Sequence, residues 1–118
     1  MNKTGCQTAG LAIRDTLDIV GGKWTLSILH ALIFEGTQRF KELQRNVDGI
    51  TARMLSKELK LLEMNQMIER RVFDTAPITV EYSITQHGRS LEPVIKALYS
   101  WGMEHRKRIF DVEETMVK

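Results

Sequence analysis

The sequence has one cysteine and no long apolar run, and each of these features excludes a class of protein. A lone thiol, Cys6, cannot build an internal disulfide framework, which excludes a small secreted domain held by several disulfides. No apolar run approaches the roughly 20 residues that a membrane-spanning helix needs. A secretory signal has an apolar stretch after its first charged residues, and the first residues of this sequence lack one. We therefore expect a cytoplasmic protein that does not engage a membrane.

Signatures of catalysis and of metal binding are also missing. The histidines lie far apart, and no set of His, Cys, Asp and Glu has the spacing of metal ligands. No glycine-rich loop that would cradle a phosphate is present. We expect no enzymatic activity, no metal site and no cofactor.

What the sequence does contain is the composition of one small globular domain, residues 1–118. Hydrophobic residues make up 42% and charged residues 27%. The net charge of +2 is small, but residues 1–110 carry 16 basic residues against 12 acidic ones. This excess points to a nucleic-acid partner only if it gathers on one face.

The spacing of apolar residues predicts four helices before any strand. Gly21 and Gly22 end the first, and the second is apolar on most sides, as expected for the centre of a core. Thr51 is a good N-cap for the fourth, although Met54 stands where a capping box needs Glu or Gln. The predicted helices are residues 8–20, 23–34, 39–47 and 51–64.

After Asn65 and Gln66 the apolar pattern changes to alternation, which predicts a β-hairpin. The two strands are residues 67–74 and 78–85. A last helix begins near Thr85 or Ser90 and reaches about Phe110, with Pro93 in its first turn or at a kink. The predicted fold is mainly α with a small β-hairpin (α+β).

Residues 39–47, 48–50 and 51–64 form a helix, a tight turn and a helix, the order of a helix-turn-helix unit at 39–64. On a helical projection at about 100° per residue, Leu55, Leu59 and Leu62 share one side. The opposite side carries the candidate DNA contacts Arg53, Ser56, Lys57 and Lys60, with Thr51 at the N-terminus. Arginine suits guanine or phosphate, and lysines suit phosphates. A merely solvated face is the alternative, which the neighbouring elements disfavour.

The hairpin, residues 67–85, fits the wing of a winged helix-turn-helix protein. Its tip has small, polar and rigid residues. Thr75 and Thr79 are candidate phosphate contacts, and Pro77 restricts the tip. A plain surface turn is the alternative reading.

The last helix carries more apolar residues than one face can bury. We expect it to form a two-fold homodimer together with the first helix, through Leu11, Leu91, Val94, Ile95, Leu98, Trp101 and Met103. Packing of the last helix against residues 8–20 of the same chain is the competing interpretation. The dimerisation helices would be about 8–22 and 86–110, and the DNA-binding core 23–85.

Several motifs at these separations resemble one family. They are Ile19-Val20-Gly21-Gly22-Lys23-Trp24, Arg39-Phe40-Lys41-Glu42-Leu43, Gly49-Ile50-Thr51 with Met54-Leu55 and Leu59, Val80-Glu81-Tyr82, Thr85 with Gly88, and Leu98 with Trp101. Over about residues 11–105 the chain resembles the HxlR-type regulators, winged-helix proteins related to MarR-like repressors.

The resemblance implies a dimeric transcriptional regulator, which we expect to be a repressor, bound to double-stranded DNA at a palindromic promoter site. It places the recognition helix at residues 51–60, and it implies that Lys23 and Arg39 contact the phosphate backbone of the DNA. Solubility or an internal ion pair explains these two cations equally well. A winged-helix module that docks an acidic protein partner is the alternative function.

Two departures from the family pattern stand out. Gln66 replaces a frequent glycine, and we expect Asn65 to take over its left-handed conformation. Cys6 lies upstream of the position where many members carry a sensor cysteine, so an incidental thiol is favoured over a redox switch. The sequence leaves any small-molecule or redox effector unidentified, although Met54, Met64 and Met67 are candidates for lining an effector cavity.

Overall fold

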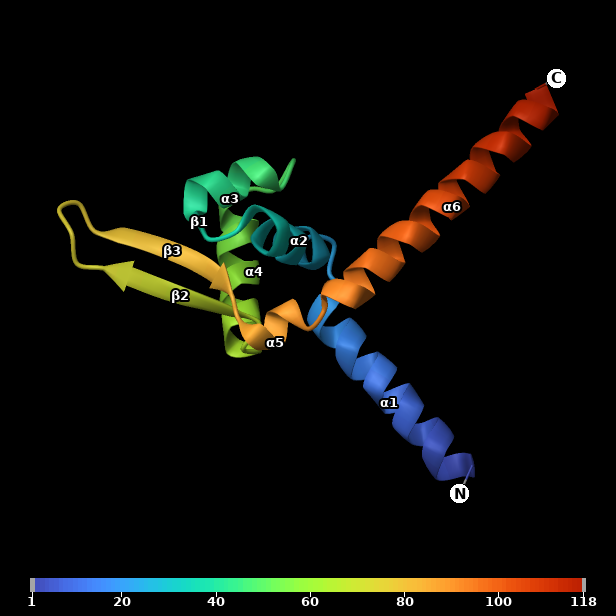
Figure 1. Ribbon diagram of the computed structural model, residues 1–118, viewed down its shortest axis with the longest axis horizontal. Helices are drawn as coiled ribbons and strands as arrows, with labels where there is room; N and C mark the ends of the chain where they lie inside the picture. The colour runs from blue at the N-terminus through green and yellow to red at the C-terminus, as the bar shows by residue number, and fades with distance from the viewer. Residues whose placement is uncertain (1, 118) are drawn as a thin grey trace.

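A computed structural model describes the backbone of residues 2–117 and the side chains of residues 5–110 (Figure 1). It confirms a mainly helical fold with a small antiparallel sheet of order β1-β3-β2. The elements are α1 (Asn2–Val20), α2 (Thr25–Glu35), β1 (Gln38–Arg39), α3 (Phe40–Asn46), α4 (Ala52–Met64), β2 (Ile68–Phe73), β3 (Thr79–Ile84), α5 (Gln86–Arg89) and α6 (Glu92–Val117).

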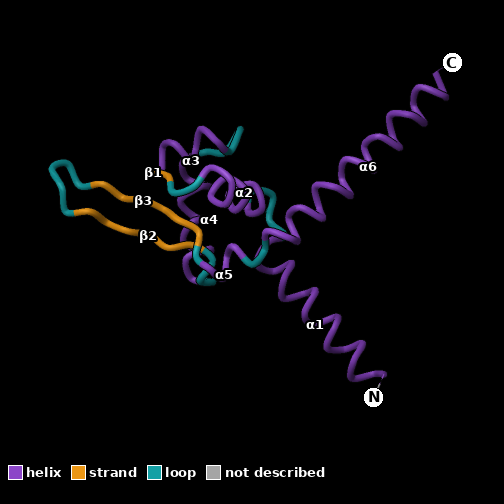
Figure 2. Tube along the Cα trace, in the orientation of Figure 1, coloured by secondary structure: helices purple, strands orange, loops and turns teal. Residues whose placement is uncertain are grey.

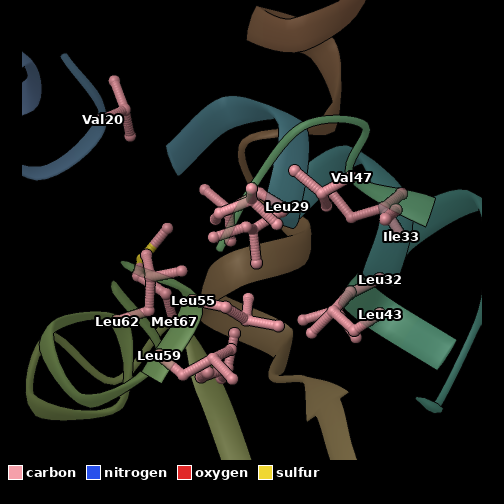
Figure 3. Packing of buried hydrophobic residues seen from close by; sticks show 14 of the residues in the cluster. Val20, Leu29, Leu32, Ile33, Leu43, Val47, Leu55, Leu59, Leu62 and Met67 are labelled. Carbon is pink, nitrogen blue, oxygen red and sulfur yellow. The ribbon is translucent and has the colours of Figure 1, made fainter. Parts of the chain in front are cut away.

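The core surrounds α2, as its nearly all-round apolar sequence predicts. Ile28, Leu29 and Leu32 of this helix are fully buried. Leucines from α3 and α4 meet them, and Val20 and Met67 close the side near α1 (Figure 3). Burial of these side chains stabilises each by roughly 1.5–3 kcal/mol relative to exposure. The helix-turn-helix is therefore anchored to a rigid centre within a single chain.

The short strand β1 is a feature that the sequence analysis missed. Its residues Gln38 and Arg39 pair with Tyr82 and Glu81 of β3. Two residues are too few for the alternation of a strand to show. The buried Gln38 amide donates to the Ala31 carbonyl at 2.9 Å, so this polar side chain is satisfied inside the core.

The turn between α4 and β2 has left-handed backbone at Gln66 itself, with φ of 62°. Asn65 stays at φ of −85°, so the expected shift of the turn to Asn65 is wrong. The Met67 N–H donates to the Leu62 carbonyl and the Gln66 N–H to the Glu63 carbonyl, each at 3.0 Å. This is a Schellman motif, and it places the left-handed residue two positions beyond the last helical one.

The end of the wing is tied to this same turn. Thr85 caps α5 by accepting the Gly88 N–H at 2.9 Å, and its hydroxyl contacts the Gln66 carbonyl at 2.7 Å. A Cβ on Gly88 would lie 2.1 Å from the Met67 carbonyl oxygen, so only glycine fits there. The last predicted helix is therefore two helices, and α5 packs with the core.

Helices α1 and α6 leave the core and diverge from each other, and the two ends of the chain lie far apart (Figure 2). The radius of gyration is 18.0 Å, against about 13.5 Å for a compact chain of this length. The apolar residues of the two helices therefore do not bury one another, in contrast to the competing interpretation from the sequence.

Within residues 2–117, no helix is on its own both long and apolar enough to cross a bilayer. Residues 5–20 and 25–35 meet that standard only together, as a pair bent by 77°.

Candidate nucleic-acid interface

Helix α4 presents the two faces that its sequence predicts. Leu55, Leu59 and Leu62 are buried to 2% exposure or less. The Thr51 hydroxyl accepts the Met54 N–H at 3.1 Å and so caps the helix. The buried leucines fix the rotation of α4, and this rotation decides which side chains face solvent.

The outward side of α4 is cationic and open. Arg53, Lys57 and Lys60 are exposed and Ser56 is half-buried. Together with Leu61 they line a shallow depression of about 470 Å³. The ion pairs among side chains 5–110 are Arg71 with Glu69 and Lys96 with Glu92, so none neutralises this surface. We call these five residues the α4 surface.

One acidic side chain of α4 is held away from the α4 surface. Glu58 accepts a hydrogen bond from the Thr25 hydroxyl at 3.1 Å, at the N-terminus of α2. The positive end of the α2 dipole favours a carboxylate there. The contact therefore leaves the cations of α4 without an opposing charge at their centre.

A second crevice continues the α4 surface toward the wing. It measures about 300 Å³ and is lined by Ser56, Leu59, Lys60 and Glu63 of α4, Arg70 of β2 and Tyr82 of β3. Arg70 and Tyr82 are register partners. Arg70 was not among the predicted contacts, although strand alternation indicates it, because Arg70 shares a face with the buried Ile68.

The C-terminal turn of α4 adds exposed apolar side chains to this side, among them Met64, which the sequence had made a candidate for lining an effector cavity. Met64 is 78% exposed and Leu61 44%. At helical spacing, Met64 follows Lys57 and Lys60 along the outward side. The candidate interface therefore combines cations, which bind phosphates, with apolar side chains, which can contact thymine methyl groups.

Lys23 and Arg39, the two predicted contacts outside α4 and the wing, lie at separate positions in the fold. The Lys23 ammonium lies 4.9 Å from the centre of the Trp24 ring, and a Cβ on Gly49 would come 3.5 Å from that ring. Lys23 is therefore close to the turn of the helix-turn-helix. Arg39 is exposed at the start of α3, where its backbone N–H donates to the Glu42 carboxylate at 3.1 Å.

The wing tip differs from the α4 surface in its chemistry. The Thr75 hydroxyl donates to the Pro77 carbonyl at 2.6 Å and lies 2.9 Å from the Thr79 hydroxyl. These contacts fix the shape of the tip. Val72, Phe73 and Ile78 around it are exposed apolar residues, so the cations of the wing lie at its base.

The residues expected at a dimer interface divide into two groups. Leu11, Val94, Leu98, Trp101 and Met103 are exposed large apolar side chains. Ile95 is only 7% exposed and Leu91 packs against the same core. These two differ from the expectation because Leu91, just before α6, and Ile95, in its first turn, pack on the core before the helix projects.

The remaining predicted residues are Cys6 and three methionines. Cys6 is an exposed free thiol on α1. Met67 is buried, whereas Met54 and Met64 are exposed, so of the three methionines only Met67 faces an interior. Among the described side chains, no group of three or more His, Cys, Asp and Glu is placed to hold a metal ion.

Comparison with known proteins gives a consistent result. Residues 19–110 match the HxlR-like helix-turn-helix family. YdeP from Bacillus subtilis strain 168, described as an uncharacterized HTH-type transcriptional regulator, is 43% identical over 104 residues, which are 88% of this chain and 80% of YdeP.

Solved structures agree in fold. The redox regulator HypR in its reduced form is 38% identical with a TM-score of 0.77, covering 83% of this chain and 96% of HypR. The reduced form of the transcriptional regulator YodB from B. subtilis is 32% identical with a TM-score of 0.69, covering 76% of this chain and 87% of YodB. The winged helix-turn-helix core, the motifs within it and these relatives all agree, and the chain belongs to the HxlR-like helix-turn-helix family of transcriptional regulators.

Proposed function

We propose that the protein binds double-stranded DNA through the α4 surface, with α4 in the major groove. The observation that carries this proposal is the set of Arg53, Lys57 and Lys60 on one exposed side, unpaired by any carboxylate in the described part of the chain. An α-helix fits the major groove, and cations that replace condensed counterions supply the affinity.

The wing supplies a second set of contacts beside α4. Arg70 and Lys60 both line the crevice between the two elements, together with Glu63, so basic side chains continue from α4 onto β2. Phosphates that flank the major groove would be held between α4 and the base of the wing. Lys23, near the turn between α3 and α4, is a candidate for the phosphates on the other side.

The functional unit in this proposal is a homodimer joined by α1 and α6. The apolar residues that these helices leave exposed are the reason, because a second copy would bury them. A two-fold dimer presents two α4 helices to half-sites about 34–36 Å apart, one turn of DNA. Occupation of such a palindromic site would exclude other proteins from a promoter, so we propose a repressor.

Selection of bound sites from a random duplex pool tests this function. We expect an enriched sequence with symmetric half-sites separated by about one helical turn. An acidic polypeptide serves as the competing ligand, because the alternative is a module that docks an acidic protein. Failure to enrich any duplex, with retention of the acidic polypeptide, would favour that alternative.

The repressor role needs its own measurement. Run-off transcription from a promoter that overlaps the selected site should fall as the protein is added. A scrambled site in the same promoter is the control, and an increase in transcript would instead indicate an activator.

A further inference from the structure

The C-terminal half of α4 carries an apolar patch that the phosphate contacts of the proposed function do not use. The patch consists of Leu61 and Met64, and Met64 is the most exposed large apolar side chain within residues 5–110. Their spacing of three residues makes them neighbours on the helix surface. Single exposed apolar residues are common on proteins, so the position of this pair is what makes it informative.

The apolar patch lies among the cations of α4. On a helical projection at about 100° per residue, Met64 falls between Arg53 and Lys57. Leu61 lines the same shallow depression as Arg53, Lys57 and Lys60. Leu61 is one turn beyond Lys57, about 6 Å along the helix axis, which is well within the width of a major groove. A ligand that covers these cations therefore also covers the patch.

The apolar patch has no role in the core and does not suit a second copy of the chain. The leucines that α4 contributes to the core lie on its opposite side. Two copies meeting through this surface would bring Arg53, Lys57 and Lys60 against the same three cations, which is unfavourable. The occupant must therefore present negative charge and an apolar group close together.

Duplex DNA presents both features in its major groove. Phosphates flank the groove, and the C5-methyl group of thymine is an apolar group on a base edge within it. The apolar patch has no hydrogen-bond donor, so it cannot contact the acceptor atoms of guanine in the way that arginine does. Burial of a methyl group against aliphatic side chains is favourable without any hydrogen bond.

We propose that Leu61 and Met64 read the methyl groups of thymine and thereby specify thymines in each half-site. The cations of α4 supply affinity that is largely independent of sequence, whereas the apolar patch supplies sequence preference. This inference rests on the proposed function, because it requires α4 to lie in the major groove.

Deoxyuridine substitution tests the inference on the site obtained from the random duplex pool. Each thymine of one half-site is replaced in turn by deoxyuridine, which removes the methyl group and keeps every hydrogen-bonding group of the base. Binding is measured by fluorescence anisotropy with the full-length protein at one fixed salt concentration. We expect at least one substitution to weaken binding about fourfold, the effect of exposing one buried methyl group.

Variants show which side chains detect the methyl group. Leu61→Ala combined with Met64→Ala should bind the thymine and deoxyuridine sites equally. Lys57→Ala is the matched control from the same side of α4, and it should weaken binding to both sites while keeping the fourfold ratio between them. Both residues of the apolar patch are exposed, so circular dichroism of the double variant should match that of the parent protein.

Each alternative result has a distinct meaning. Equal binding of the thymine and deoxyuridine sites by the parent protein, or a selected site without thymine, would overturn this inference and leave the proposed function standing. A fourfold ratio that persists in the double variant would assign the methyl group to another side chain and would also overturn it. Absence of any duplex binding would overturn this inference together with the proposed function.

Discussion

The core and the two projecting helices treat apolar residues in opposite ways. In α2, α3 and α4 the leucines and isoleucines that face inward are buried within one chain. On α1 and α6 residues of the same kind, among them Leu17 and Leu98, are exposed. The core is complete in one copy of the chain, while α1 and α6 expose apolar surface that the proposed homodimer would bury. Stability and assembly should therefore respond to different substitutions.

The largest expected effect is in the core. Leu59→Ala should lower the free energy of unfolding by about 2–5 kcal/mol, because it leaves a cavity between α4 and the sheet. Chemical denaturation measures this loss. Leu61→Ala on the same helix is the matched control and should change stability by no more than about 0.5 kcal/mol. Equal losses would mean that the rotation of α4 is wrong.

The next effect is on assembly. Trp101 is 68% exposed, and Trp101→Glu should place a charge in the dimer interface and raise the dissociation constant at least about 100-fold. Sedimentation should then show a monomer whose circular dichroism keeps the helical signal of the core. Tyr99 has the same exposure but lies about 200° around the helix, so Tyr99→Glu should remain dimeric. If the Trp101→Glu variant remained dimeric, this interface would be rejected.

A smaller effect is expected at the turn after α4. Gln66→Gly should stabilise the core by about 0.5–1 kcal/mol, because glycine adopts the left-handed conformation without the cost that glutamine bears. Thermal unfolding would detect it. Asn65→Gly should destabilise, since that residue lies at negative φ. The reverse order would contradict the Schellman geometry.

The smallest effect is expected at Cys6, which is exposed on α1 far from the core. Cys6→Ser should leave DNA affinity unchanged, with and without a mild oxidant such as diamide. A loss of affinity in oxidised parent protein that the serine variant lacks would show a thiol switch.

The sequence was informative where a pattern repeats over many residues. The apolar spacing of α2, the two faces of α4 and the alternation of β3 each predict the observed element. It was uninformative where geometry depends on distant residues. The pairing of β1 with β3, the crevice between Lys60 and Arg70, and the close approach of Gly88 to Met67 all join segments through tertiary packing. Asn65 has a higher intrinsic tolerance of left-handed backbone than Gln66, yet the Schellman hydrogen bonds place that conformation at Gln66.

The salt dependence of duplex DNA binding tests the central claim most directly. For the parent protein the logarithm of the binding constant should fall linearly with the logarithm of salt concentration. Lys57→Ala should make the slope shallower by about 0.9 for each lost phosphate contact, while Lys107→Ala, on α6, should leave it unchanged. Identical slopes for the parent and Lys57→Ala would contradict the placement of α4 against DNA.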